Sequence, residues 1–152
     1  MYNLTEKNIS YILKAFREHT DITSSFLFTE DGFIIAVDQG NFNEDDDYFQ
    51  SIGAICAGVI SLAENGLDII KNRNFVKQIK IQAGNQLDDN GFMIILESIN
   101  NEIMISVIFP IYLNLAIILF ELNQTIIKLS NYFSTLEKSK NIENKSKLVY
   151  LS

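Results

Sequence analysis

The sequence predicts one α/β domain, an α+β sandwich whose five-stranded antiparallel sheet carries helices on both faces. Three observations predict this class. The spacing of apolar residues changes between about 3.6 and 2 along the chain, which indicates the order α-β-β-α-β-β-β-α. Short turns join most of the expected strands, which favours antiparallel pairing. Most strands are almost continuously apolar, which indicates that both faces of the sheet are covered.

The first three elements are a helix and a β-hairpin. Apolar residues recur every three or four positions over residues 4–19, which is typical of an amphipathic helix. Two short apolar runs follow, 25–29 and 33–37, and Asp31-Gly32 lies between them. An Asp-Gly pair between apolar runs is a strong local hairpin signal, so these runs are predicted to pair with each other.

A second helix is predicted over residues 48–71. The acidic run 44–47 precedes it, and carboxylates stabilise the first turn of a helix. Small residues are interspersed among its large apolar ones and widen its apolar stripe almost around the helix: Gly53, Ala54, Ala57, Gly58 and Ser61. Tight packing on its own sheet would explain these small residues. The sharper hypothesis is that one side meets the sheet and the other meets a partner.

Three further strands complete the predicted sheet. Residues 76–83 alternate, with Ile79 and Ile81 on one face, so this strand has one wet face and is expected at a sheet edge. Residues 92–99 and 103–109 are two apolar strands joined by a turn at Asn100-Asn101. The edge strand has few safeguards against pairing with a second copy of the chain.

The last helix is predicted over residues 113–136, and the polar residues 137–152 are predicted to form a flexible tail outside a domain of residues 1–136. The apolar stretch 103–120 approaches the length of a membrane span. Pro110 divides it and acids flank it, so a buried strand followed by a helix is the better interpretation. We therefore expect no transmembrane segment, and the absence of a secretory signal favours a cytoplasmic protein.

Composition and side-chain inventory argue against several function classes. The chain has 152 residues, with 12 Lys and Arg against 19 Asp and Glu, and this acidic balance argues against nucleic-acid binding. Cys56 lies on an apolar stripe and is expected to be a buried structural thiol, whereas His19 ends a helix and is expected at the surface. The chain lacks both common glycine-rich phosphate-binding loops. We expect no catalytic residue and no cofactor.

Two acidic patterns could suggest a metal site. The run 44–47 is one, but such a run usually marks a solvated helix start. The second places acceptor residues and a glycine at calcium-loop spacing, at Gln86, Asp88, Asn90, Gly91 and Glu97. Its first position is Gln where an acid is needed, and its flanks resemble strands where such a loop needs helices. We interpret it as a hairpin loop and expect no bound metal.

The order of elements and several stretches resemble the roadblock/LC7 family. The resembling stretches are the strand–turn–strand 26–35, the Ala- and Gly-bearing helix 46–71, and the strand 105–109. Asn114-Leu115-Ala116 is similar to the Asn-Leu-Gly that often opens the last helix of the family, with Ala in place of Gly. The resemblance covers about residues 4–136, and its specificity comes from the order and spacing of these stretches.

This resemblance implies a non-enzymatic homodimer, or a heterodimer with a paralogous roadblock protein. The third strands would pair across a two-fold axis, and the second helices would pack side by side. Such dimers act as platforms for small Ras-like GTPases, as activators or scaffolds, and also within dynein and lysosomal signalling complexes. The implied interface maps to strand 76–83 and helix 48–71, with candidate contacts at Ala54, Ile55, Gly58, Val59, Leu62, Gln78, Lys80 and Gln82. The Ile- and Asn-rich composition would suit an archaeal member.

A second interpretation is a sensor or trafficking adaptor domain of the GAF, PAS or longin type, since these folds also flank a sheet with helices. A sensor would hold its ligand in an internal cavity lined by polar groups. The nearly wholly apolar strands 92–99 and 103–109 do not favour such a cavity. The function best supported by the sequence is therefore a protein–protein interaction module.

Overall fold

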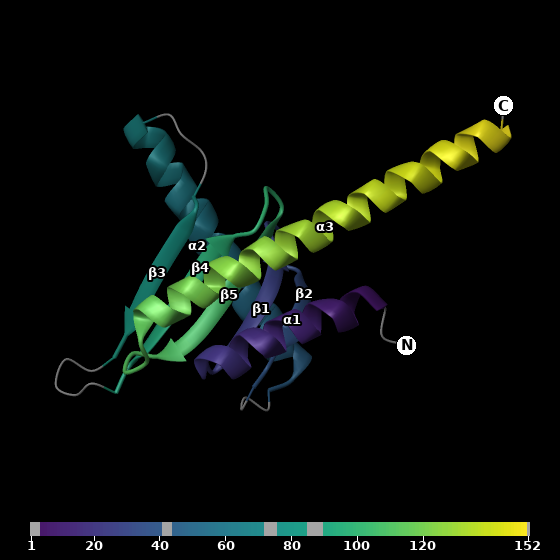
Figure 1. The fold of residues 1–152 in the computed structure, drawn as a ribbon. Coiled ribbons are helices and arrows are strands. Elements are labelled where there is room, and N and C mark those ends of the chain that lie inside the picture. The colour runs from purple at the N-terminus through teal and green to yellow at the C-terminus, as the bar shows by residue number, and fades with distance from the viewer. Residues whose placement is uncertain (1–3, 41–43, 72–75, 85–89, 152) are drawn as a thin grey trace.

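The computed structural model describes residues 4–40, 44–71, 76–84 and 90–151. All eight predicted elements are present in the predicted order (Figure 1). They are α1 (Leu4–Thr20), β1 (Ser24–Thr29), β2 (Ile34–Asp38), α2 (Asp46–Lys71), β3 (Gln78–Ala83), β4 (Phe92–Ser98), β5 (Ile103–Pro110) and α3 (Leu115–Leu151). The strands form one five-stranded sheet in the order β2-β1-β5-β4-β3, and every neighbouring pair is antiparallel. The predicted fold class is confirmed.

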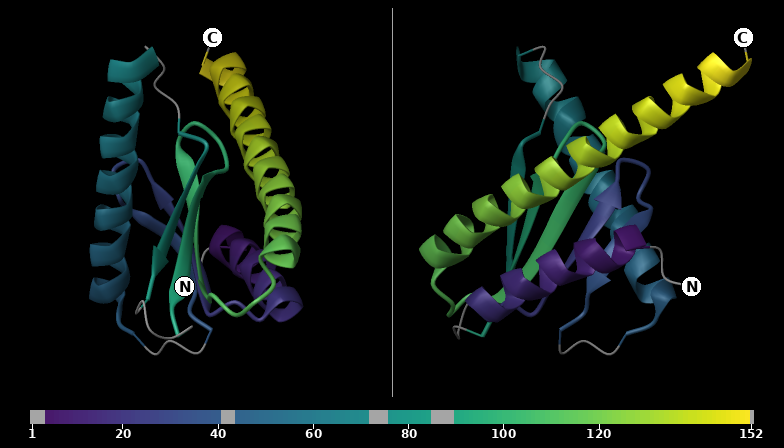
Figure 2. Two further views of the ribbon diagram at one scale, coloured as in Figure 1. Left: turned by 90° about the vertical axis from the view of Figure 1, so that its left-hand side faces the viewer. Right: turned by 45° about the vertical axis from the view of Figure 1, so that its right-hand side comes forward.

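The molecule has three layers, with α1 and α3 on one face of the sheet and α2 on the other (Figure 2). Each face has its own apolar cluster, and alternate residues of β1 serve the two sides. Leu27 packs with Leu13 of α1 and Leu122 of α3. Phe26 and Phe28 point the other way, toward α2. The continuous apolar runs in the strands are explained by these two covered faces.

The turn between β1 and β2 fixes the hairpin against α2. Gly32 has a φ of 87°, and its N–H donates to the carbonyl of Thr29 at 2.9 Å. The turn lies so close to the helix that a Cβ on Gly53 would stand 2.7 Å from the carbonyl oxygen of Gly32. A glycine at position 53 is therefore required by packing within the chain.

The two edges of the sheet are protected differently. β2 is short, and a register shift between Leu27 and Phe28 interrupts its pairing with β1. Arg17 of α1 also reaches this edge, where its Nε donates to Asp38 Oδ2 at 2.6 Å. This hydrogen bond raises the pKa of Arg17. Bulged, short edges resist pairing with other chains, whereas β3 at the opposite edge carries no comparable device.

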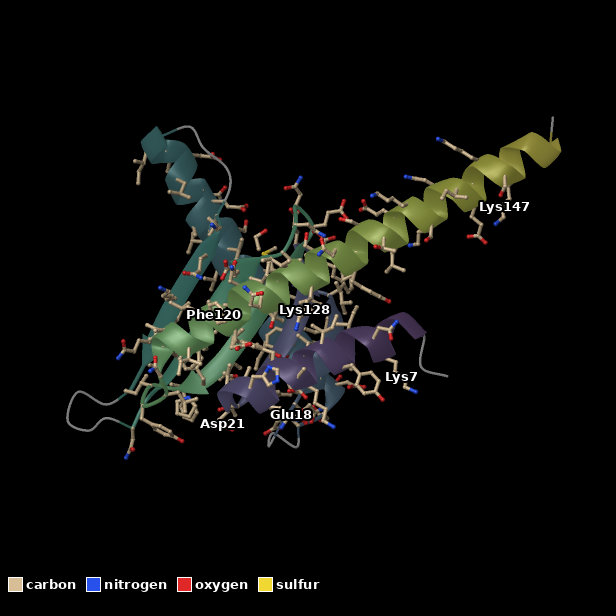
Figure 3. All side chains as sticks on the ribbon, viewed as in Figure 1. Lys7, Glu18, Asp21, Phe120, Lys128 and Lys147 are labelled. Carbon is tan, nitrogen blue, oxygen red and sulfur yellow. The ribbon has the colours of Figure 1, made fainter. Side chains whose placement is uncertain are left out.

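α3 is longer than the sequence predicts. Its start is capped by Asn114, whose Oδ1 accepts the N–H of Ala116 at 3.0 Å. The prediction that the helix stops at residue 136 is wrong, since the helix continues to Leu151 and projects beyond the rest of the molecule (Figures 1 and 2). The side chains of residues 137–147 are exposed, as Figure 3 shows for Lys147, and this segment contains no Gly or Pro to end the helix. The domain boundary at residue 136 and the mobility of the tail stay predictions.

Candidate functional site

The most unusual surface of the molecule is the outer side of α2. One side of this helix is buried against the sheet through Phe49 and Ile60. On the opposite side, Ile55, Leu62 and Ile69 are 66%, 74% and 87% exposed. These three residues are seven positions apart, so they form one stripe along the helix. We call the row Ile55, Leu62 and Ile69 the outer apolar stripe.

The two flanks of this stripe differ in polarity. The flank toward the β1–β2 turn carries Ser61 and Glu64, which line a surface depression together with Asp31. The flank toward β3 carries Ile52 and Val59. The exposed apolar surface of α2 is therefore directed to one side of the molecule, toward β3. A directed apolar surface is what an interface requires and what a solvated helix avoids.

An apolar groove of about 340 Å³ lies between this flank and the sheet. Its helix wall is formed by residues such as Ile52, Ile55 and Val59, and its sheet wall by residues such as Ile94 and Ile108. None of the described residues that line it is charged. The groove arises because α2 packs mainly on β1 and β2, which leaves the same face of β3 and β4 partly uncovered. Ile55 joins the groove to the outer apolar stripe.

β3 is an open edge beside this groove, as predicted from its alternating pattern. It pairs with β4 on one side and has no neighbour on the other among the strands of the sheet. Residues 80–83 of this strand are exposed on both faces, and Ile81 lines the groove. The open backbone edge and the apolar surface of α2 therefore lie on the same side of the molecule.

By length and composition alone, α2 could also cross a membrane. It is the one helix of the described residues that passes this test, over Asp46–Ile70, and 17% of its apolar 18-residue window is buried. A single helix of this kind is weak evidence for a membrane span. Glu64 and Asp68 lie within Asp46–Ile70, and the buried side of the helix packs on the sheet. What the observation does establish is that α2 carries more apolar surface than its own chain covers. The stretch 103–120, considered above as a span, forms β5 and the start of α3.

Chemistry-bearing side chains are dispersed in the described part of the chain. Cys56 is buried beneath α2, and burial raises the pKa of its thiol to about 11, as suits a structural thiol and not a nucleophile. His19 is exposed, with its Nδ1 3.7 Å from Glu121 Oε2. Asp45 caps α2 by accepting the N–H of Tyr48 at 2.9 Å. Within the described residues, no three His, Cys, Asp or Glu side chains gather as a metal site would require. Of the calcium-like pattern, Gln86 and Asp88 lie outside the described residues, whereas Asn90, Gly91 and Glu97 lie within them.

The overall arrangement is similar to solved structures of known proteins. MglB from Myxococcus xanthus superposes with a TM-score of 0.73 at 17% identity, covering 90% of this chain and 95% of that one. The gliding protein MglB from Thermus thermophilus gives 0.71 at 11% identity, covering 87% and 93%. A roadblock/LC7 domain from Streptomyces avermitilis gives 0.68 at 16% identity, covering 82% and 97%. The chain has a roadblock/LC7 fold. No family model and no curated protein matches its sequence.

Within this roadblock/LC7 fold, the predicted interface residues divide into two groups. The first lies together on α2: Ala54, Ile55, Gly58 and Leu62 are exposed, and Val59 lines the groove. The second lies on β3, where Gln78, Lys80 and Gln82 alternate with Ile79, which packs on the α2 side. Their side chains therefore point to the sheet face opposite α2. Gln78 is already engaged there, since its Nε2 donates to Glu97 Oε2 at 2.7 Å.

Several residues of this surface were not identified from the sequence as candidate contacts. Ile69 extends the outer apolar stripe and could have been found from its spacing of seven to Leu62. Ile81 could have been found from its place on the apolar face of the edge strand. Ser106 lines the groove from β5, and nothing in its sequence context signals that position.

Proposed function

We propose that this chain is a non-enzymatic dimeric roadblock-type protein of the cytoplasm that binds a small Ras-like GTPase and regulates or scaffolds it. The observation that carries the proposal is the outer apolar stripe of α2 lying beside the open edge of β3. The roadblock/LC7 fold supports a small GTPase as the partner, because the family that the sequence resembles provides platforms for such proteins. The chain itself would contribute no nucleotide chemistry.

In the proposed dimer, β3 of one protomer pairs with β3 of a second copy or of a paralogous roadblock protein. The contact on β3 is made by the backbone, so its side chains, including Lys80 and Gln82, stay on the faces of the extended sheet. The α2 helices then cover each other's outer apolar stripes. Gly58 supports close approach of the helices, because a Cβ at this position would have no atom of the described residues within 4 Å.

The dimer is tested by measuring mass in solution for the protein and for Gly58→Arg. We expect the protein to be a stable dimer at micromolar concentration. We expect the Gly58→Arg variant to dimerise at least about 100-fold more weakly, because Arg places a bulky charge in an apolar helix contact. Ser61→Arg is the matched control, since Ser61 lies on the polar flank of the same helix near Asp31 and Glu64. A protein that is monomeric at these concentrations, or a Gly58→Arg variant that still forms dimers as well as the control, contradicts the proposed interface.

The GTPase is tested separately, with the dimer as bait for Ras-like GTPases from the same genome in GDP and GTP-analogue states. Preferential retention of the GTP-analogue state supports regulation, because only a differential affinity can shift a switch. Equal retention in both states supports scaffolding. Failure to retain any of them, with the dimer intact, contradicts this part of the proposal.

A further inference from the structure

The groove between α2 and the sheet contains an unusual polar atom. Ser106 lies at the centre of the sheet on β5 and is fully buried. Its side chain lines the groove, and its Oγ has no hydrogen-bond partner among the described residues. The nearby Ser106 hydroxyl lowers the pKa of the Cys56 thiol, against the larger effect of burial. The two groups nevertheless lack the geometry of a hydrogen bond.

An unpartnered hydroxyl in an apolar wall is costly, and alanine would avoid that cost with almost the same shape. Ser24 and Ser25 on β1 are also buried without a partner. Neither of them lines the groove, so Ser106 is the one of these three serines whose side chain lies in the groove wall. The Ser106 hydroxyl therefore lacks a hydrogen-bond partner within the described residues.

We infer that this groove is a binding site for a neutral aliphatic alcohol or a similar uncharged lipid-like molecule, whose polar group bonds to Ser106. The lining determines this class. Apart from Ser106, Cys56 and Tyr48, all of its described side chains are hydrocarbon, so the rest of the ligand must be apolar. None of its described side chains is cationic, so the carboxylate of a fatty acid or the phosphate of a phospholipid would be left unpaired there.

The volume limits the size of this ligand. About 340 Å³ lies at the lower end of the range of roughly 300–1,000 Å³ for small-molecule sites. It suits a chain of about ten carbons and excludes a lipid with two long acyl chains. Phe92 and Ile81 stand at the β3 side of the groove, next to the edge that the proposed dimer pairs. A second copy would therefore close over the ligand, although binding itself requires only the groove of one protomer.

The site is tested by titrating the protein with 1-decanol and following the δ1 methyl resonances of its isoleucines by NMR. We expect saturable shifts at Ile55, Ile94 and Ile108, which line the groove. Ile9 and Ile118 are buried in the layer on the other face of the sheet and should not move. Sodium decanoate at the same concentration should bind at least about tenfold more weakly, because its carboxylate finds no cation.

Two serine variants distinguish a specific binding site from non-specific binding to apolar surface. Ser106→Ala should weaken 1-decanol binding about five- to tenfold by removing the hydrogen bond. Ser25→Ala is the matched control, because Ser25 is an equally buried, unpartnered serine on the same sheet that lies outside the groove, and it should leave the affinity unchanged. Equal effects of the two variants would overturn the assignment of Ser106.

The remaining outcomes also decide the inference. Shifts that fail to saturate and include the exposed Ile69 and Ile142 indicate adsorption to apolar surface, and would overturn it. Equal affinity for decanol and decanoate overturns the uncharged class of ligand. The mass of the same samples is measured in parallel. If the protein is a dimer and 1-decanol causes no shifts, the second copy fills the groove. That outcome overturns this inference alone and leaves the proposed function standing.

Discussion

Gly53 is the residue at which two distant parts of the chain touch most closely. A methyl group here would meet the Gly32 carbonyl oxygen at 2.7 Å, and that atom belongs to the backbone of a tight turn. We expect Gly53→Ala to destabilise the protein by about 1–3 kcal/mol in urea unfolding, in spite of the better helix propensity of alanine. Gly66→Ala in the same helix meets no atom of the described residues within 4 Å and should stabilise the protein by about 0.5–1 kcal/mol. Equal changes in the free energy of unfolding for the two variants would show that the β1–β2 turn can move away from α2 at little cost.

The small residues of α2 show where sequence reasoning reaches its limit at this scale. They favour either packing within the chain or a partner, and the structure contains both situations. Gly53 and Ala57 face inward, toward the hairpin turn and the sheet, whereas Ala54 and Gly58 face outward. The residue types alone cannot separate the two groups, because the direction of each depends on how the helix is rotated against strands that are distant in sequence.

The thiol of Cys56 should make stability depend on alkaline pH. Burial raises its pKa to about 11 from 9.0. Below pH 9 the thiol is protonated in both states and its contribution is fully present; between pH 9 and 11 it ionises only in the unfolded chain, so stability is lost as pH rises. We expect the free energy of unfolding of the protein to fall about 2–3 kcal/mol more than that of Cys56→Ala between pH 8 and 11. Parallel losses in the two proteins would mean that the thiol ionises in place.

At the scale of elements, the distal part of α3 is separable from the fold. The side chains of residues 137–147 are exposed, and the hydrogen bonds of Ser139 and Ser146 stay within the helix itself. Removing residues 138–152 should therefore change the free energy of unfolding by less than about 1 kcal/mol. Circular dichroism should show the loss of about three to four turns of helix. A much larger loss of stability would reveal contacts of the distal segment with the domain or with a second copy.

The predicted elements succeeded where a local pattern determines them. The Asp31-Gly32 turn, the alternation in β3 and the periodicity of α2 each place an element within a few residues of its observed bounds. The end of α3 was missed because the loss of the apolar stripe was read as the end of the helix. An exposed helix needs only residues that tolerate helical geometry, and residues 137–151 include no breaker.

The candidate site was predicted less completely than the fold. The α2 surface and the edge of β3 were found, because small residues and an alternating strand leave local signals. The groove was not found, because it depends on how far α2 diverges from β3 and β4. The residues next to Ser106 in its strand are apolar, so the sequence around it does not indicate a binding role. Its place in the groove is seen only in the structure.

For the whole molecule, the amount of uncovered apolar surface leads to a test that needs no variant. If a second copy covers the outer apolar stripe, unfolding is coupled to dissociation, and the apparent stability rises with protein concentration. We expect about 1.4 kcal/mol more stability for each tenfold increase, seen as a rising urea midpoint between about 1 and 100 µM. Coincident midpoints across this range would indicate a protomer that is stable alone, or a dimer too weak to contribute.

The unequal borders of the sheet have a consequence for how large such an assembly can grow. β2 is shortened, bulged and held by Arg17, whereas β3 is open. Pairing through β3 would bury the open edge of each subunit. The edges left at both ends of the joined sheet would be the β2 edges, which resist the addition of another strand. If the proposed dimer forms, growth by strand addition would therefore terminate at two subunits, and the open edge of β3 would not lead to fibres.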